Sequence, residues 1–256
     1  MTPSPFKKAT SATVLGSAGW RLLLHETVDS TNDLARELPP WSAVRAVAQT
    51  SGRGRFGRSF VSDAGGLWLS ATLPAEGGAA RWGGFSLMVG CHLLRVLENL
   101  AVPQARLRWP NDLMSGKKKL AGLLIEQGSR EALTVGIGMN VHNKPWQHDR
   151  SLADTSARLA DLLPAAPDLE TVAVLVLDAI GMAHHAMLEG GLSSAVREFN
   201  AQGTPESPVE ITLISGEVIS GRFAGLDRDA NLRILVPRGQ ERLLPHHHIA
   251  RLKELG

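Results

Sequence analysis

Cysteine is almost absent from this chain, since Cys91 is the single one among 256 residues. One cysteine excludes an intrachain disulfide and a zinc site built from several thiolates. We therefore expect a reducing, cytoplasmic location, with Cys91 in a protein core. We find no apolar run that approaches the ~20 residues of a membrane span, and no long apolar segment of a secretory signal near the N-terminus. The sequence predicts neither secretion nor contact with a membrane.

An excess of charge of one sign is also missing. The chain has 27 Lys and Arg against 25 Asp and Glu, a formal net charge of +2. This balance is too small to indicate a nucleic-acid partner from composition alone. The hydrophobic fraction of 43% and the charged fraction of 20% are those of an ordinary globular protein, which excludes disorder and fibrous repeats. The positions of the positively charged residues in the sequence are therefore more informative about function than the net charge.

Hydrophobic patterns predict a mixed α/β or α+β core, a β-sheet flanked by helices. Alternation predicts strands at 20–26, 43–49, 67–73, 107–109, 120–126 and 132–141. Helical spacing predicts helices from 31 to about 38 and over 85–100, 168–188 and 192–200. Residues 1–19 lack periodicity and are expected to form a loose tail.

The pattern of hydrophobic and turn residues changes after Pro205 and Pro208. Short strand patterns follow at 209–213, 218–226, 232–236 and 242–244, with turn residues between them. Closely spaced strands of this kind indicate a small SH3-like β-barrel. We therefore divide the chain into a tail (1–19), a main domain (20–205) and a C-terminal SH3-like domain (206–256).

The most distinctive motif is Gly-Arg-Gly-Arg-Phe-Gly-Arg at 52–58, which we name the Arg loop. Its glycines exclude regular helix or strand, and they let backbone N–H groups approach an anion closely. Its arginines present bidentate donors to carboxylate or phosphate. We favour anion binding over a solvated basic turn, because the loop lies between two predicted strands. No Gly-Lys-Ser/Thr follows, so this is not a Walker P-loop.

A second motif, Arg-Trp-Pro-Asn-Asp at 108–112, is followed by Lys-Lys-Lys-Leu-Ala-Gly at 117–122. Asn111 and Asp112 at a strand end suit a metal or a polar ligand. Lys119 opens an apolar strand, so its ammonium group should project from a defined position. Lys117 and Lys118 are expected at a solvated hairpin tip.

Two weaker patterns have alternatives. Gly-Ile-Gly-Met-Asn-Val at 136–141 indicates either close approach of a ligand or a bulged strand. Asp-Ser-Thr-Asn at 29–32 is either a helix cap or a polar ligand site at a helix start. The histidines at 246–248 are expected on a strand, where neighbours point to opposite faces and cannot converge on one metal.

Together these motifs resemble the biotin protein ligases. The order and spacing of the motifs at 52–58, 108–112, 119–126 and 136–141 agree with that family, as do Ser-Thr-Asn at 30–32, Gln49 and Gly-Gly-Leu-Trp-Leu-Ser at 65–70. The resemblance covers residues 20–255. It implies a class II synthetase-like catalytic core that binds biotin and ATP with Mg²⁺. Biotin would be activated as biotinoyl-5′-adenylate and passed to a lysine of a biotin carboxyl carrier protein, of acetyl-CoA carboxylase or another biotin-dependent enzyme.

The resemblance also implies roles for individual residues. Lys119 and Arg55 would be catalytic. The biotin site would comprise Ser30, Thr31, Asn32, Gln49, Arg53, Gly54, Arg55 and Lys119. The ATP site would comprise Arg55, Arg58, Phe60, Asn111, Asp112, Lys119 and Asn140, with Asp112 as the candidate Mg²⁺ ligand. Phe60 stands where many members carry a tryptophan near the adenine.

Two rival functions remain at this point. Lipoate ligases and octanoyl transferases have a related core but lack the Arg loop. A nucleic-acid-binding module would explain the Arg loop but not Trp-Pro-Asn-Asp or Lys-Leu-Ala-Gly. Because only a short segment precedes the first predicted core strand, we expect the family's short type, without specific DNA binding. The sequence leaves a monomer and a homodimer equally open.

Overall fold

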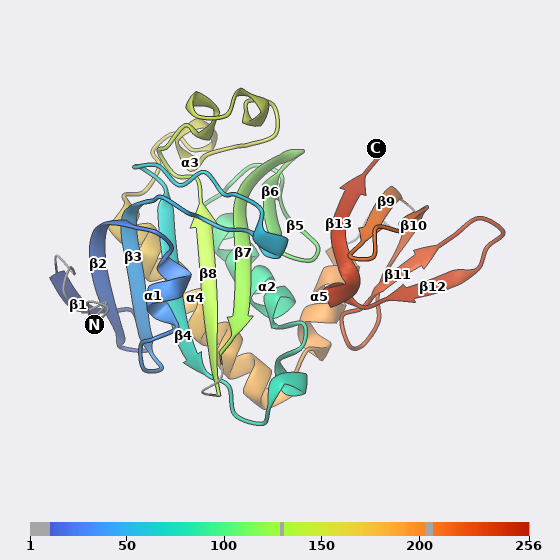
Figure 1. Cartoon of the computed structure of the whole chain (residues 1–256), viewed down its shortest axis with the longest axis horizontal. Helices are drawn as coiled ribbons and strands as arrows, with labels where there is room; N and C mark the ends of the chain where they lie inside the picture. Colours follow the sequence, from blue (N-terminus) through green and yellow to red (C-terminus); the bar gives the residue numbers. More distant parts are fainter. Residues whose placement is uncertain (1–10, 129–130, 203–206, 256) are drawn as a thin grey trace.

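The computed structural model describes residues 11–128, 131–202 and 207–255, and within them two β-sheets (Figure 1). The large sheet has eight strands in the order β1-β2-β3-β4-β8-β7-β6-β5, and the small sheet has five in the order β12-β11-β10-β9-β13. All neighbouring strands are antiparallel except β2 and β3, which are parallel.

The element bounds follow the predicted pattern closely. The large sheet consists of β1 (Ser11–Leu15), β2 (Trp20–Val28), β3 (Ser42–Gln49), β4 (Leu67–Pro74), β5 (Ala105–Arg108), β6 (Asp112–Ser115), β7 (Lys118–Gln127) and β8 (Ala132–Met139). The helices are α1 (Thr31–Ala35), α2 (Phe85–Asn99), α3 (Leu159–Leu162), α4 (Leu169–Gly190) and α5 (Ser193–Gln202). The small sheet consists of β9 (Pro208–Leu213), β10 (Val218–Leu226), β11 (Leu232–Leu235), β12 (Glu241–Leu244) and β13 (Ile249–Glu254).

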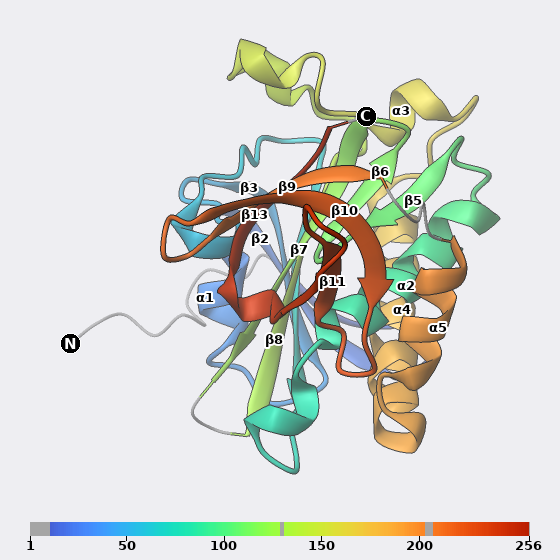
Figure 2. The same cartoon turned by 90° about the vertical axis from the view of Figure 1, so that its right-hand side faces the viewer.

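The large sheet has a covered face and a face that carries the site. Helices α2 and α4 lie on one side of it and α1 on the other (Figure 2). Strand β4 shows why: Leu67, Leu69 and Leu73 belong to the main core, whereas Ser70 and Thr72 hydrogen-bond to residues of α1. Period-two alternation thus sends apolar groups to α2 and α4 and polar groups to the α1 side.

Helix α4 corrects one expectation from the sequence. An 18-residue stretch of this 22-residue helix has a mean hydropathy of 1.6, so by length and composition the helix could cross a membrane. Half of that stretch is buried within the molecule, and α4 packs against α2 and β4. The apolar character of α4 is thus accounted for by its place in the core, although the expectation that no such run exists was wrong.

Four local expectations also change. Residues 11–15, assigned to the tail, pair with β2 as strand β1, while residues 1–10 lie outside the described residues. The sequence patterns missed the short strands β6 and β13. The histidines at 246–248 form a 3₁₀ turn, η6 (His246–His248), and not a strand. Lys118 is the first residue of β7 rather than part of the hairpin tip, although it is exposed as expected.

The small sheet curls around on itself and packs beside the edge of the large sheet that ends in β5 (Figures 1 and 2). This confirms the α+β fold with a small SH3-like C-terminal unit. Arg106 on β5 forms a bidentate ion pair with Glu254 on β13, with N–O distances of 2.9 and 2.7 Å. Residues 203–206, which include the predicted boundary at 205, lie outside the described residues, so the exact division of the chain stays a prediction.

Candidate active site

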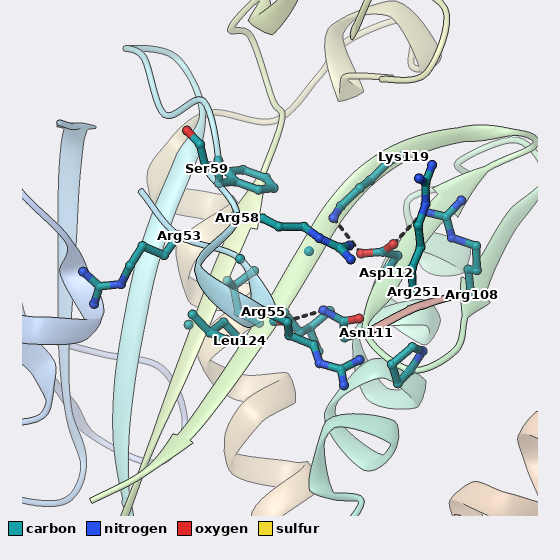
Figure 3. Close-up of a pocket in the computed structure, with 18 of the residues that line it drawn as sticks. Arg53, Arg55, Arg58, Ser59, Arg108, Asn111, Asp112, Lys119, Leu124 and Arg251 are labelled. Atoms are coloured by element: carbon teal, nitrogen blue, oxygen red, sulfur yellow. Dashed lines mark hydrogen bonds and ion pairs between the residues drawn. The ribbon is translucent and has the colours of Figure 1, made fainter. Parts of the chain in front are cut away.

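A cavity of about 630 Å³ opens between the large sheet, the Arg loop and strand β13 (Figure 3). Twelve of the thirteen site residues predicted from the sequence line it. They are Ser30, Thr31, Asn32, Gln49, Arg53, Gly54, Arg55, Arg58, Phe60, Asn111, Asp112 and Lys119. Segments as distant in sequence as α1 and β13 therefore meet at one site.

One end of the cavity is lined by neutral polar side chains that hydrogen-bond to one another and, through the Asn32 amide, to the Glu126 carboxylate at 2.7 Å. We name it the polar corner: Ser30, Thr31, Asn32, Gln49 and Ser70. The Thr31 N–H and hydroxyl both donate to Gln49 Oε1, at 2.8 and 3.0 Å. The Ser70 hydroxyl donates to Asn32 Oδ1 at 2.6 Å and lies 2.7 Å from the Thr31 hydroxyl. These bonds fix the amide and hydroxyl groups in place, which suits recognition of a neutral polar group.

The arginines of the Arg loop point in different directions. Arg53 turns away from the cavity to Asp33 in α1, with an Nη1–Oδ2 distance of 2.9 Å, and this hydrogen bond lowers the pKa of Asp33 and raises that of Arg53. Arg55 instead donates to the carbonyls of His246 and Ile249, at 2.9 and 3.1 Å. Arg58 donates to the carbonyl of Ala250 at 2.7 Å. The C-terminal unit thus holds two of the three guanidinium groups.

The opposite end of the cavity carries concentrated positive charge. We name it the cationic wall: Arg55, Arg58, Arg108, Lys119 and Arg251. Asp112 lies between two of these cations, with Oδ1 2.6 Å from Lys119 Nζ and Oδ2 2.6 Å from Arg108 Nη2 (Figure 3). Burial alone would raise the pKa of Asp112, but Lys119 and Arg108 outweigh it and hold that pKa below its usual value. Asp112 is the carboxylate paired within the wall, since Glu254, the other carboxylate of the cavity lining, is paired with Arg106. The five cations therefore outnumber the carboxylates, and the wall can accept further anions.

Glycines form the floor between these two ends, and each makes room for a side chain of the site. A Cβ at Gly136 would lie 2.2 Å from Asn32 Oδ1, and one at Gly138 would lie 2.8 Å from the Phe60 ring. A Cβ at Gly122 would lie 2.9 Å from Lys119 Nζ. The alternating glycines therefore mark close approach by the protein's own side chains, whereas the first interpretation expected a ligand. Strand β8 pairs with β4 and β7 without a shift in register, so it is not the bulged strand of the second interpretation.

Asn140 is the predicted site residue that does not line the cavity. It is buried, its amide donates to the Ala157 carbonyl at 3.1 Å, and its Oδ1 accepts from Asn143 at 3.0 Å. Its contact with adenine, which the resemblance implies, stays a prediction. Asn111 does line the cavity, but its amide is committed to the Leu123 carbonyl at 2.8 Å.

Three residues of the site were not among the predicted site residues. Arg108 opens the Arg-Trp-Pro-Asn-Asp motif, but no role was predicted for it. Ser70 is fully buried, and its polarity within the apolar strand Leu-Trp-Leu-Ser-Ala-Thr-Leu was the available signal. Arg251 projects from β13 beside Asp112 and Arg108 (Figure 3). Nothing in the sequence joins Arg251 to the other motifs, because only the packing of the small sheet brings it there.

The carboxylates offer little to a metal ion on their own. Within residues 11–128, 131–202 and 207–255, no group of three or more His, Cys, Asp or Glu side chains could hold one. Asp112 has both oxygens in ion pairs. Magnesium prefers one or two carboxylates together with substrate phosphates, so these residues fit an ion that arrives with a nucleotide better than a resident one.

Comparison with known proteins agrees with this geometry. Residues 23–142 match the model of the Biotin/lipoate A/B protein ligase family. The chain is 33% identical over 176 residues to a biotin–[acetyl-CoA-carboxylase] ligase of Mycobacterium tuberculosis, covering 62% of this chain and 63% of that protein. It is 35% identical over 149 residues to the bifunctional ligase/repressor BirA of Escherichia coli, covering 54% of this chain and 46% of BirA.

Solved structures extend the likeness to nearly the whole chain. A biotin protein ligase from Aquifex aeolicus, in complex with biotin and ATP, superposes with a TM-score of 0.80 at 26% identity and covers 91% of this chain and 98% of that one. The chain spans about half the length of the BirA relatives that it matches. The similarity to the biotin/lipoate A/B protein ligase family thus covers residues 23–142 in sequence, and the likeness to solved biotin protein ligases covers nearly the whole chain in fold.

Proposed function

We propose that this protein is an ATP-dependent ligase that activates biotin as biotinoyl-5′-adenylate and transfers it to a lysine of a biotin carboxyl carrier protein. The observation that supports this most directly is the pairing, in one cavity, of a neutral polar corner with a cationic wall. A substrate that carries a neutral polar ring at one end and a carboxylate at the other matches both ends. The named relatives and the Aquifex complex with biotin and ATP add support.

The first step joins two anions, which explains the concentrated positive charge of the cationic wall. A carboxylate oxygen of biotin attacks the α-phosphorus of ATP, the bond to the bridging oxygen breaks, and pyrophosphate leaves. In the second step a carrier lysine amine attacks the acyl carbon, loses a proton, and AMP leaves. Both partners of the first step repel each other, so fixed cations lower its barrier by stabilising charge that develops on the phosphoryl oxygens.

Lys119 is the group best placed to bridge the two anions. Its ammonium group lies over the floor formed by Gly122 and within 5.4 Å of the Phe60 ring centre. Asp112 holds it in the absence of substrate, and an incoming carboxylate and phosphate would take over that contact. Arg55 and Arg58 would add charge from the loop side, fixed by the carbonyls of His246, Ile249 and Ala250.

The polar corner would receive the ureido ring of biotin. Thr31, Asn32, Gln49 and Ser70 supply donors and acceptors whose directions are already set by their mutual hydrogen bonds. Arg53, which is paired with Asp33, would have to turn inward to contact ligand as the resemblance implies. We treat Mg²⁺ as part of the nucleotide substrate, with Asp112 as the candidate protein ligand once Lys119 is released.

The second step needs a partner protein with an exposed lysine whose amine can reach the acyl carbon in the cavity. A biotin carboxyl carrier domain is the partner we propose. A cytoplasmic location, the lack of specific DNA binding and the assembly state stay predictions. Buried Cys91, whose pKa burial raises to about 12, gives no sign of a reactive thiol.

The proposal is tested by measuring the exchange of labelled pyrophosphate into ATP with different carboxylic acids as substrates. We expect exchange with biotin and little with lipoate or octanoate. Mass spectrometry of a carrier domain incubated with protein, biotin and Mg·ATP should then show one biotinoyl addition on one lysine. Exchange driven by lipoate but not biotin would instead establish the lipoate ligase function of the related fold.

A further inference from the structure

The Arg loop and the two residues that follow it form a small hairpin. The Gly54 N–H donates to the Arg58 carbonyl at 2.7 Å, and the Phe60 N–H donates to the Gly52 carbonyl at 2.9 Å. We name the residues joined by these bonds the stem: 52–54 and 58–60. The residues between them form the tip of the hairpin. The position of the stem therefore decides where the tip lies over the cavity.

The arginines leave this hairpin on two opposite sides. Arg55 and Arg58 reach backbone carbonyls between residues 246 and 250. Arg53 extends from the stem in the other direction, away from Arg55 and Arg58 (Figure 3). Its two terminal nitrogens donate to the two carboxylate oxygens of Asp33, with Nη1 2.9 Å from Oδ2. Such bidentate pairs combine strength with a defined orientation. The hairpin is thus held by the small sheet on one side and by α1 on the other.

Helix α1 is a firm support for the stem. Ala35 is fully buried, and its carbonyl accepts a hydrogen bond from the Thr72 hydroxyl of β4. Asn32 accepts the Ser70 hydroxyl, also of β4, at 2.6 Å. Asp33 lies between these two attachment points and directly follows the polar corner in sequence. A group bound to Asp33 is therefore fixed relative to the polar corner.

The ion pair of Arg53 also belongs to a chain of charges. Glu126 Oε2 accepts from the Asn32 amide at 2.7 Å and from Arg36 Nη2 at 3.1 Å. The same Arg36 nitrogen lies 3.9 Å from Asp33 Oδ1. The chain thus runs from the stem of the Arg loop back to Asn32 of the polar corner. Isolated exposed ion pairs contribute little to stability, whereas bidentate pairs within a network hold their geometry.

We propose that Asp33 is a positioning residue, which anchors the stem of the Arg loop beside the polar corner and thereby sets where the loop covers the substrate. This inference rests on the proposed function, since it assigns a role in binding biotin. The opposite role would be a latch that keeps the loop from the cavity until Arg53 is released. Gly54 and Arg55, however, already line the cavity while the pair is formed. The geometry therefore favours an anchor over a latch.

Hydrogen exchange tests the anchor without any reference to activity. In Asp33→Ala, the backbone amides of Gly54 and Phe60 should exchange at least about fivefold faster, because the stem loses its attachment to α1. In Asp33→Glu, which keeps a carboxylate, the same amides should stay within about twofold of wild type. The amide of Leu69 within β4 should not change in either variant. Unchanged exchange at Gly54 and Phe60 in Asp33→Ala would overturn the proposal.

Kinetics of adenylate formation separate an anchor from a latch. Asp33→Ala should raise the KM for biotin by about 5- to 20-fold, because the substrate must then order the stem as it binds. The rate at saturating biotin should fall by less than about threefold, and Asp33→Glu should restore most of the loss in KM. In an Arg53→Ala background, Asp33→Ala should have no further effect, because it acts through Arg53. A lowered KM for biotin would identify a latch, and fully additive losses would place the action of Asp33 elsewhere. Either result would refute the proposal.

Glu241 provides a matched control. It forms a bidentate pair with Arg233 between β12 and β11, at 2.8 and 2.9 Å, with side chains about as exposed as those of Asp33 and Arg53. Neither Glu241 nor Arg233 lines the cavity. Glu241→Ala and Asp33→Ala should lower the melting temperature by similar amounts, at most about 2–4 °C, but only Asp33→Ala should change the KM for biotin. Equal changes in that KM would contradict the anchor. If the wild-type protein activated no acid while Gly54 and Phe60 still responded to Asp33→Ala, the proposed function would fail and the anchor would stand.

Discussion

The two ends of the cavity differ in how their polar groups are satisfied. In the polar corner, side chains satisfy one another, as in the Ser70–Asn32 and Thr31–Gln49 bonds. In the cationic wall, Asp112 pairs with Lys119 and Arg108, and three backbone carbonyls accept from Arg55 and Arg58. A neutral group can be recognised by a preorganised network, whereas two anions can be brought together only by surplus positive charge. The chemistry proposed here needs both.

The largest effect is expected at the cationic wall. Lys119→Ala should slow single-turnover adenylate formation by about 10²–10³, or roughly 3–4 kcal/mol, because its contact strengthens as charge develops on phosphate. Lys118→Ala is the matched control, since its exposed side chain reaches only the Ala153 carbonyl. Circular dichroism should confirm that both variants fold. Equal losses of rate in the two variants would mean that the catalytic role does not belong to Lys119.

Two glycines that lie two residues apart should separate the ends of the cavity. Gly136→Ala would force Asn32 out of its bonds, and Gly138→Ala would displace Phe60. We expect the first to raise the KM for biotin and the second the KM for ATP, each by about 10- to 100-fold, or 1–3 kcal/mol of lost contacts. Steady-state kinetics with each substrate varied would show this. If both variants affected the same substrate, the division into two ends would not hold.

Asp112 should define how the cationic wall responds to pH. Its pKa is below the usual value of 3.8, so it is ionised in both the folded and unfolded states above about pH 5. Asp112→Asn should therefore lower the free energy of unfolding by about 1–3 kcal/mol, to the same extent at pH 8 and pH 5.5. As the pH falls below 3.8 the difference should shrink, because Asp112 is protonated first in the unfolded chain and then, at its lower folded-state pKa, in the folded protein as well. Urea denaturation at several pH values measures this, and a difference that already vanished at pH 5.5 would contradict it.

A change in ionic strength should produce the smallest difference between the two ends of the cavity. Raising ionic strength from 0.05 to 0.5 M should increase the KM for ATP by about 2- to 5-fold, because the mouth of the cationic wall is open to screening ions. The KM for biotin should change by less than about twofold, since its ring would bind the neutral corner. Equal sensitivity of both constants would show that charge dominates throughout the cavity.

Much of this arrangement could be predicted from local sequence. The glycine spacing in the Arg loop, the polar residues at 30–32 and the position of Lys119 at the start of an apolar strand are short-range patterns. Gly54, residues 30–32 and Lys119 all line the cavity. Period-two alternation placed β4 and β8 in the sheet, and 3.6-residue spacing placed α2 and α4. Such patterns work because propensity and burial act within one element.

The contacts between elements were decided only by the tertiary structure. The partners of Arg53 and Arg55 lie 20 and 191 or more residues away, and no pattern within the loop distinguishes one arginine from the other. The resemblance implied that Asn140 faces the adenine, and only the folded chain shows that its amide donates to the Ala157 carbonyl. The sequence by itself determined which residues could form strands, helices, a flexible loop and a cationic site. Which backbone carbonyl or carboxylate each polar group meets depended on the packing of β13 and residues 155–157, because hydrogen bonds and ion pairs form between surfaces that only the folded chain brings within reach.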